Sequence, residues 1–241
     1  MMPTLHAVHI PSQASRERKS LCGMRDGLVS ARTMLINTVR GWLRRDASQM
    51  PSGQSHTFPM RVRKLYREKR ASPLPGFVER QLVAIESLCE QIKAADLELL
   101  HLVEQDEVCV RLMSMPGVGP VVSARYSAAL DDASRFGSAH RVESYLGLTP
   151  GEQSSSDRQR RTGIIKAGAP EVRAVLTPAA WTLRRTRPQD PMVLWALEVE
   201  KRRGKRVAII ALARKMAGVL YAMWRDGSTY NPEHRKPSAM S

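Results

Sequence analysis

The sequence has no long apolar run and few cysteines, and both shortages narrow the class of protein. Its longest strictly apolar run covers only residues 207–213, whereas a helix that crosses a bilayer needs roughly 20 apolar residues. The N-terminus lacks the charged and then apolar order of a signal peptide. The three cysteines, Cys22, Cys89 and Cys109, are odd in number and far apart, so they indicate neither a disulfide framework nor a cysteine zinc site. We therefore expect a cytoplasmic protein without a membrane span.

Acidic residues are also scarce, with 23 Asp and Glu against 38 Lys and Arg, for a formal net charge of +15. Residues 1–75 carry +10, residues 149–187 and 188–241 carry +5 each, and the segment 76–115 carries −5. Arginine supplies 29 of the 38 cations, and its planar fork suits bidentate contact with phosphate. This charge predicts a polyanionic partner, and DNA or another nucleic acid is the first choice.

Two long stretches in the N-terminal half have the three-and-four spacing of an amphipathic helix. The first runs from about 13 to 45 and the second from 77 to about 113. The segment 47–76 between them is rich in proline and glycine around a basic cluster at 61–70, so we expect turns and a short basic helix there. The two apolar stripes are Leu21, Met24, Leu28, Ala31, Leu35, Thr38, Val39 and Trp42, and Val78, Leu82, Ile85, Cys89, Ile92, Ala95, Leu99 and Leu102.

Such apolar stripes need a helical partner. The two long helices can pair with each other as an antiparallel hairpin, or with a second copy of the chain as a coiled coil. The spacing alone does not separate these alternatives.

Shorter helices with clear start and stop signals follow Pro116. Helices are expected at 120–130, from Ser138 to Gly147, from about 169, from 191, and at 206–225. The predicted fold is therefore mainly α: a long helical hairpin or coiled coil, followed by a compact helical domain.

The turn at 115–120 holds two glycines, Gly117 and Gly119, between two expected helices. Glycines at this spacing permit a tight turn whose backbone N–H groups, with the N-terminus of the next helix, can hold a phosphate oxygen. This is the logic of a helix-hairpin-helix motif, and it predicts DNA contact that does not depend on base sequence. A simple glycine-rich turn is the alternative.

The segment 147–168 brings hydroxyl groups and cations together. Ser154, Ser155 and Ser156 form a polar stretch, and four cations follow it, namely Arg158, Arg160, Arg161 and Lys166. A hydroxyl nucleophile and phosphate-neutralising cations would then lie on one loop. A serine-rich basic loop is also typical of a flexible linker.

Several of these motifs together resemble the C-terminal transposase domain of the insertion-sequence 110/116/902 transposases. The resemblance covers about 105–232. It is carried by Pro116-Gly117-Val118-Gly119-Pro120, Phe136-Gly137-Ser138-Ala139, Tyr145-Leu146-Gly147-Leu148-Thr149-Pro150, Glu152-Gln153-Ser154-Ser155, Gly163-Ile164-Ile165-Lys166-Ala167-Gly168, Val207-Ala208-Ile209-Ile210-Ala211-Leu212-Ala213-Arg214-Lys215, Trp224-Arg225-Asp226-Gly227 and Tyr230-Asn231-Pro232.

The resemblance implies a DNA recombinase in which a serine attacks a phosphodiester during transposition. The family serine precedes a glycine, which aligns it with Ser155. Ser156 stands where that glycine is expected, so Ser154 is the second choice. The resemblance also implies a structured guide RNA and a homo-oligomer.

The family pairs this domain with an N-terminal RuvC-like nuclease domain whose acidic residues bind Mg²⁺. On this resemblance, residues 1–12 are the remnant of that domain. Residues 5–11 are expected to form a terminal strand or its remnant. Residues 13–113 are a helical linker or coiled coil, 114–232 the transposase domain, and 233–241 a disordered tail. We therefore expect an N-terminally truncated transposase with no metal site or cofactor of its own. Glu17, Asp26 and Asp46 are expected to be solvated surface groups.

Two other functions compete with an active transposase. One is a catalytically dead, DNA-binding remnant of such an enzyme, which covalent chemistry with DNA would distinguish. The other is a purely structural coiled-coil protein, for which no salt-dependent affinity for DNA is expected.

Overall fold

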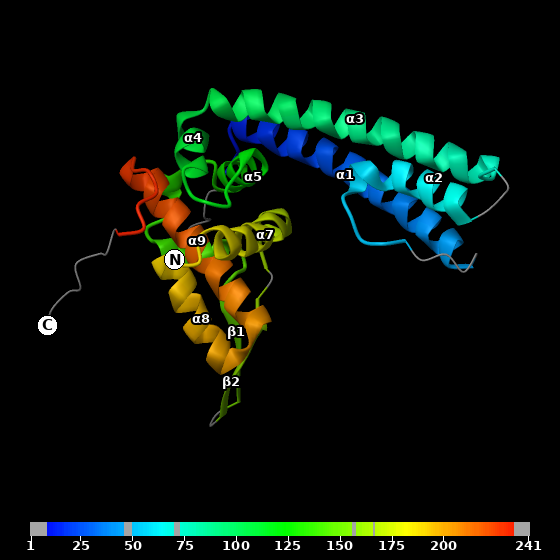
Figure 1. Cartoon of the computed structure of the whole chain (residues 1–241). Coiled ribbons are helices and arrows are strands. Elements are labelled where there is room, and N and C mark those ends of the chain that lie inside the picture. Colours follow the sequence, from blue (N-terminus) through cyan, green and yellow to red (C-terminus); the bar gives the residue numbers. More distant parts are fainter. Residues whose placement is uncertain (1–8, 46–49, 70–72, 156–157, 166, 234–241) are drawn as a thin grey trace, which may run out of the picture. The chain divides into compact units, whose positions relative to one another are not determined.

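The computed structural model describes residues 9–45, 50–69, 73–155, 158–165 and 167–233, and the chain forms two compact units (Figure 1). Unit 1 comprises residues 1–19 and 100–241, and unit 2 comprises residues 20–99. The described elements are nearly all helical, which confirms the predicted mainly α class. In chain order they are α1 (Gln13–Arg45), a 3-10 turn (Ser55–Thr57), α2 (Phe58–Lys69), α3 (Gly76–Glu104), α4 (Glu107–Met113), α5 (Pro120–Leu130), a second 3-10 turn (Ala133–Arg135), α6 (Ala139–Tyr145), β1 (Pro150–Ser155), β2 (Arg158–Ile164), α7 (Pro170–Thr186), α8 (Pro191–Arg203) and α9 (Lys205–Asp226).

Unit 2 is an antiparallel helical hairpin of α1 and α3, with α2 packed on both. Arg25 on α1 forms an ion pair with Asp96 on α3, and Arg32 Nη1 lies 3.9 Å from Cys89 Sγ. The two long helices therefore pair within the chain. The buried core of unit 2 consists of Ile36, Val39, Leu43, Phe58, Val62, Val78, Leu82 and Ile85.

The predicted stripe of the second long helix is largely correct, but that of α1 is rotated. Met24 and Thr38 are exposed, whereas Ile36 and Leu43 are buried. Both choices satisfy a spacing of three and four, because α1 has apolar residues on more than one face. Packing against α2 and α3 decides which face is buried.

The short basic helix expected between the long helices is α2. Two arginines of α2 form hydrogen bonds or ion pairs within unit 2. The guanidinium of Arg63 bonds Glu79 and Glu86 of α3, and these hydrogen bonds raise the pKa of Arg63 above its ordinary value. Arg61 donates to the Pro51 carbonyl oxygen at 2.8 Å. These two cations are therefore already engaged by protein oxygens.

The stretch expected to be helical from 77 to about 113 is broken in two. α3 ends at Glu104, and Asp106 caps α4 by accepting a hydrogen bond of 2.9 Å from the Cys109 N–H. A capping aspartate offers the backbone a new helix start. Asp106 also pairs with Arg18, which is itself buried, and this ion pair fixes the break in unit 1.

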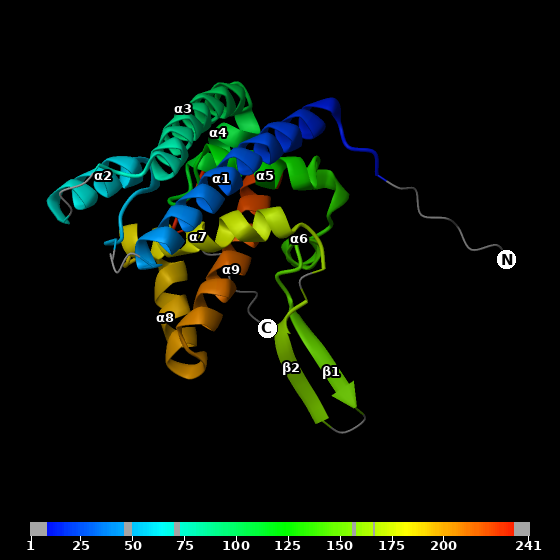
Figure 2. The same ribbon diagram turned by 90° about the vertical axis from the view of Figure 1, so that its right-hand side faces the viewer.

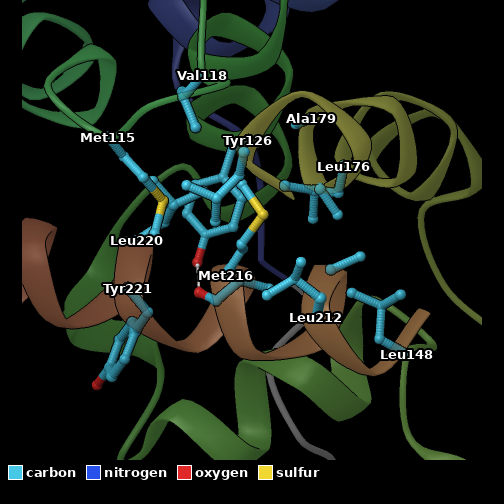
Figure 3. Close-up of a cluster of buried hydrophobic side chains, with 14 of the residues drawn as sticks. Met115, Val118, Tyr126, Leu148, Leu176, Ala179, Leu212, Met216, Leu220 and Tyr221 are labelled. Carbon is cyan, nitrogen blue, oxygen red and sulfur yellow. Dashed lines mark hydrogen bonds between the residues drawn. The ribbon is translucent and has the colours of Figure 1, made fainter. Parts of the chain in front are cut away.

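Unit 1 is a layer of helices around α9, which contacts α4, α6, α7 and α8. Figure 3 shows Tyr126 of α5 reaching α9, where its hydroxyl donates to the Ala217 carbonyl oxygen at 2.7 Å. Within the described part of the chain, α9 alone has the length and apolar composition to cross a membrane, and half of its apolar stretch is buried in unit 1. Its apolar character therefore also fits a core helix.

The N-terminal segment joins unit 1 at the end of α5. Asp131 accepts hydrogen bonds from the Ser12 N–H at 3.0 Å and the Ser12 hydroxyl at 2.5 Å, and it lies 2.7 Å from His9 Nε2. Most of the strand expected at 5–11 lies outside the described residues, and residues 9–12 form no strand. Of the expected tail, only Glu233 is described.

Candidate nucleic-acid interface

The serines and arginines singled out in the sequence lie on a β-hairpin that extends from the helices of unit 1 (Figure 2). β1 and β2 are antiparallel. The sequence led us to expect an irregular loop here, and that expectation was wrong for the described residues. Across the hairpin, Ser155 pairs with Arg158, Ser154 with Gln159, Gln153 with Arg160, and Glu152 with Arg161, and the register shifts between Pro150 and Glu152.

This pairing brings five of the predicted residues into one two-stranded ribbon. Ser154 and Ser155 end β1, and Arg158, Arg160 and Arg161 belong to β2. Lys166 and Ser156 lie outside the described residues. The backbone register therefore places both serines opposite the first two residues of the basic strand.

Two glycines form a narrow neck where the hairpin leaves the helices. Gly147 has a φ of +69°, and a Cβ atom there would overlap the Ala167 carbonyl oxygen. Gly168 has a φ of +113°, and its Cβ would overlap the Tyr145 carbonyl oxygen. Both positions combine a positive φ with a close approach of two backbones, so each of them requires glycine.

The neck is tied to the core of unit 1 on both sides. Leu146 and Leu148 are buried, and Arg173 Nη1 on α7 donates to the Leu146 carbonyl oxygen at 2.9 Å. The Ile165 N–H donates to the Thr149 carbonyl oxygen at 3.0 Å. The base of the hairpin is therefore held by α7 and by the core.

The turn that contains the other two predicted glycines packs on the same helix. Gly117 has a φ of +90°, and a Cβ there would lie 2.6 Å from the Ala179 carbonyl oxygen of α7. Gly119 is the N-cap of α5, and nothing lies within 4 Å of its added Cβ. Gly117 is thus needed for packing, and Gly119 leaves the backbone at the start of α5 open. Ala179 and Arg173 are separated by six residues, or about 9 Å along α7.

Sequence reasoning missed a second group of cations in unit 1, at the turn between α8 and α9. Residues 201–206 read Lys-Arg-Arg-Gly-Lys-Arg, and all of them are exposed. Trp181 of α7 lies against this turn, with Lys205 Nζ 5.1 Å from its ring centroid. A charge-cluster search would have found the turn, but only the fold adds the tryptophan.

Two charged side chains of unit 1 have pKa values shifted by burial. Burial raises the pKa of Glu143, although Arg214 Nε lies 3.3 Å from its carboxylate. Burial lowers the pKa of Lys215, whose ammonium lies 4.5 Å from the Trp195 ring centroid. Among the described residues, no three His, Cys, Asp or Glu side chains are placed to hold a metal ion.

A cavity of about 720 Å³ lies beside the glycine turn. The Tyr230 hydroxyl donates to Asp190 at 2.5 Å, and burial, followed by this hydrogen bond, raises the pKa of Tyr230. The Tyr230 N–H also donates to Ser114 Oγ at 2.9 Å. These bonds fasten the C-terminal segment to the turn before α5. The charged residues that line the cavity are Arg187, Asp190 and Glu233, so its carboxylates outnumber its cations and its charge does not favour phosphate.

The segment that contains the basic hairpin, its glycine neck and the surrounding helices matches a known protein family. Residues 109–192 match the family model described as Transposase IS116/IS110/IS902 family. This segment runs from α4 into α8 and includes both glycine turns and the hairpin. Residues 109–192 therefore match the transposase domain that this family model describes, in agreement with the resemblance seen in the sequence.

Individual relatives agree with this assignment. The chain is 27% identical over 236 residues to the putative transposase y4pF/y4sB of Sinorhizobium fredii, and the match covers 95% of this chain and 60% of the relative. It is 29% identical over 224 residues to the transposase for insertion sequence element IS1111A of Coxiella burnetii, covering 88% and 59%. It is 27% identical to a probable family 20 transposase of Pseudomonas aeruginosa, covering 95% and 70%. The chain thus spans about three fifths of the first two relatives.

Proposed function

We propose that this chain binds DNA and transfers DNA strands as part of an insertion-sequence transposase, with Ser155 as the nucleophile and Ser154 as the second choice. The observation that carries the proposal is the hairpin register. Ser155 pairs with Arg158, and Arg160 and Arg161 follow on the same strand. A hydroxyl and several cations on one short ribbon would supply the nucleophile and the charge neutralisation for attack on a phosphodiester.

In the proposed reaction, the serine Oγ attacks a DNA phosphorus atom and the bond from phosphorus to a deoxyribose oxygen breaks. The serine loses its proton, and the released deoxyribose oxygen gains one. The product is a phosphoserine ester, and a free hydroxyl on another strand can attack it in the reverse manner. The number of phosphoester bonds is unchanged, so strand exchange needs no nucleotide hydrolysis.

In this proposal, the cations of the hairpin neutralise the phosphates of the DNA. Arg158, Arg160, Arg161 and Lys166 would contact the attacked phosphate and its neighbours through charge-assisted hydrogen bonds. Neutralising the phosphate lowers the electrostatic barrier to an approaching oxygen. Gly117 and Gly119 would add contact with the DNA backbone through the turn before α5.

The family resemblance extends the proposal to two further partners, a structured guide RNA and a second copy of the chain, and it assigns Mg²⁺ to the RuvC-like domain of the family and not to this chain. The described residues contain no group that fits Mg²⁺, so the steps above use only side chains of this chain. Sedimentation of the purified chain tests self-association. Nuclease treatment of any co-purifying nucleic acid tests for the RNA.

A DNA-binding protein without covalent chemistry is the second candidate function. The observation in its favour is Ser156, which stands where the family glycine after the serine is expected. Added bulk at this position would affect how the neighbouring serine reaches a phosphate. DNA binding is common to both functions, and only covalent attachment separates them.

The deciding experiment looks for a protein–DNA adduct that survives detergent and is removed by protease. The probe is labelled DNA from both flanks of the coding sequence. We expect Ser155→Ala to abolish the adduct with little change in DNA affinity, because the change removes one hydroxyl and no charge. Ser154→Ala is the matched control and should retain the adduct.

Each other result has a definite meaning. Loss of the adduct in Ser154→Ala alone would move the nucleophile by one residue. An adduct that survives both substitutions would refute the serine mechanism. No adduct with the unchanged chain, despite tight DNA binding, would favour the second function.

A further inference from the structure

The basic turn between α8 and α9 carries exposed cations that carboxylates of the protein only partly neutralise. Residues 201–207 are all exposed, and Gly204 has a φ of +80° that lets the chain reverse direction there. The nearby carboxylates neutralise only part of the charge, because Glu198 pairs with Lys201 and Glu200 pairs with Arg184. The side chains of Arg203 and Arg206 form no hydrogen bond or ion pair with a described residue.

An exposed aromatic ring lies against this turn. Trp181 of α7 is 39% exposed, although tryptophan is usually largely buried. The Arg184 guanidinium carbon lies 5.6 Å and Lys205 Nζ 5.1 Å from the ring centroid. The two cations come from α7 and from the start of α9, so they join the ring and the turn into one surface. A depression of about 360 Å³ there is lined by Trp181, Thr182, Arg184 and Arg185.

We propose that Trp181 and the 201–206 turn form a binding surface for an unpaired DNA strand, separate from the serine hairpin. A nucleobase would stack on the indole ring, and the exposed cations would contact the phosphates on either side. Aromatic platforms flanked by basic side chains bind single strands in this way, because every unpaired base offers a flat π-face. In a duplex those faces are covered by neighbouring base pairs.

The choice of DNA over RNA rests on the function proposed above, in which strands are exchanged and are therefore transiently unpaired. In both views the 201–206 turn and the β1–β2 hairpin extend from the same end of unit 1 (Figures 1 and 2). A strand held at the turn would therefore leave unit 1 on the side of the serines.

The test measures binding of the full chain to labelled oligothymidylate, to oligouridylate of equal length, and to a DNA duplex. We expect Trp181→Ala to weaken oligothymidylate binding by about 5- to 150-fold, the range for loss of one stacked base. Duplex binding should change less than about twofold, since charge alone governs that contact. Trp181→Phe should restore most of the affinity, and it should also remove the part of the tryptophan fluorescence that the bound oligonucleotide quenches.

A second variant tests the cations without touching the ring. Arg203→Ala combined with Arg206→Ala should weaken binding to the single strand and lower its salt dependence. Arg44→Ala combined with Arg45→Ala removes the same charge from exposed positions at the end of α1 and should have less effect. Thermal melting should be unchanged in both arginine variants, because those side chains are exposed. Measuring it for Trp181→Ala, whose ring is partly buried, separates a loss of strand binding from a loss of packing.

Three results would overturn the proposal: equal losses for single strand and duplex in Trp181→Ala, affinity for oligouridylate equal to or above that for oligothymidylate, or a shift in oligomeric state without loss of strand binding. The last would identify the surface as a contact between copies. These results are independent of Ser155. Ser155→Ala should leave oligothymidylate binding unchanged, and failure of the adduct assay would leave this measurement intact.

Discussion

At the scale of single residues, the two glycines before α5 have different tasks. Gly117 has a positive φ and lies against the backbone of α7, whereas Gly119 has a φ of −109° and open space around it. A side chain at position 117 therefore strains the fold, but one at position 119 meets only an approaching ligand. The sequence alone treats both as equivalent parts of a phosphate-binding turn.

Alanine at these two positions should separate stability from DNA contact. Gly117→Ala should lower the free energy of unfolding of unit 1 by about 2 kcal/mol or more, from the positive φ and the clash with Ala179. Gly119→Ala should change it by less than about 0.5 kcal/mol. Denaturant unfolding measures both values, and titration with a DNA duplex measures the affinities.

The informative result is the DNA affinity of the Gly119→Ala variant. A folded protein with weaker DNA binding would support backbone contact with phosphate at the start of α5. Unchanged affinity would mean that the turn only connects two helices.

At the scale of elements, the sequence predicts helices better than it predicts the hairpin. α5, α7 and α8 each begin at a proline, and a proline at the first helical position is a local signal. The hairpin has no such signal. Its strands hold serine, glycine and arginine instead of alternating apolar residues, and its neck depends on contacts between Gly147 and Ala167, which are 20 residues apart.

The close backbone crossing at the neck predicts that Gly147 cannot be replaced without loss of stability. Gly147→Ala should lower the melting temperature of unit 1 by about 5 °C or more, because the added Cβ meets the Ala167 carbonyl oxygen. Gly163→Ala is the matched control in β2, where an added Cβ meets nothing within 4 Å, and it should melt as the unchanged protein does. Equal melting of the two variants would contradict the close backbone crossing.

Helix pairing in unit 2 could be predicted from periodicity, but not whether it occurs within one chain. Ile85 is fully buried among residues of α1, α2 and α3, and Val83 on the same helix is 54% exposed. Ile85→Asp should therefore unfold unit 2, at a cost of about 4 kcal/mol. Val83→Asp should have little effect on stability.

Circular dichroism and sedimentation distinguish the outcomes of this pair. Loss of helix on Ile85→Asp, without the release of a folded monomer, is the expected result. A folded monomer produced from a dimer would instead mean that Ile85 faces another chain.

At the scale of the whole molecule, the net charge of +15 overstates the charge available to DNA. Arg25, Arg61 and Arg63 of unit 2 are engaged by protein oxygens. The cations of β2 and of the 201–206 turn lie on elements that extend from unit 1. Counterion release depends on the number of phosphates that are contacted and not on the total charge. The salt dependence of DNA affinity therefore measures how many phosphates the protein contacts.

Affinity for a DNA duplex should fall linearly with the logarithm of salt concentration. If six to ten phosphates are contacted, it should fall by roughly 10³ to 10⁵ between 50 and 200 mM salt. Arg158→Ala combined with Arg160→Ala should reduce the slope by about 1.8, since each contacted phosphate contributes about 0.9. Lys64→Ala combined with Arg67→Ala removes the same charge from α2 and should reduce it less. An equal reduction in both variants would mean that net charge, and not the hairpin, governs DNA binding, while affinity that does not depend on salt would exclude phosphate contact as its main source.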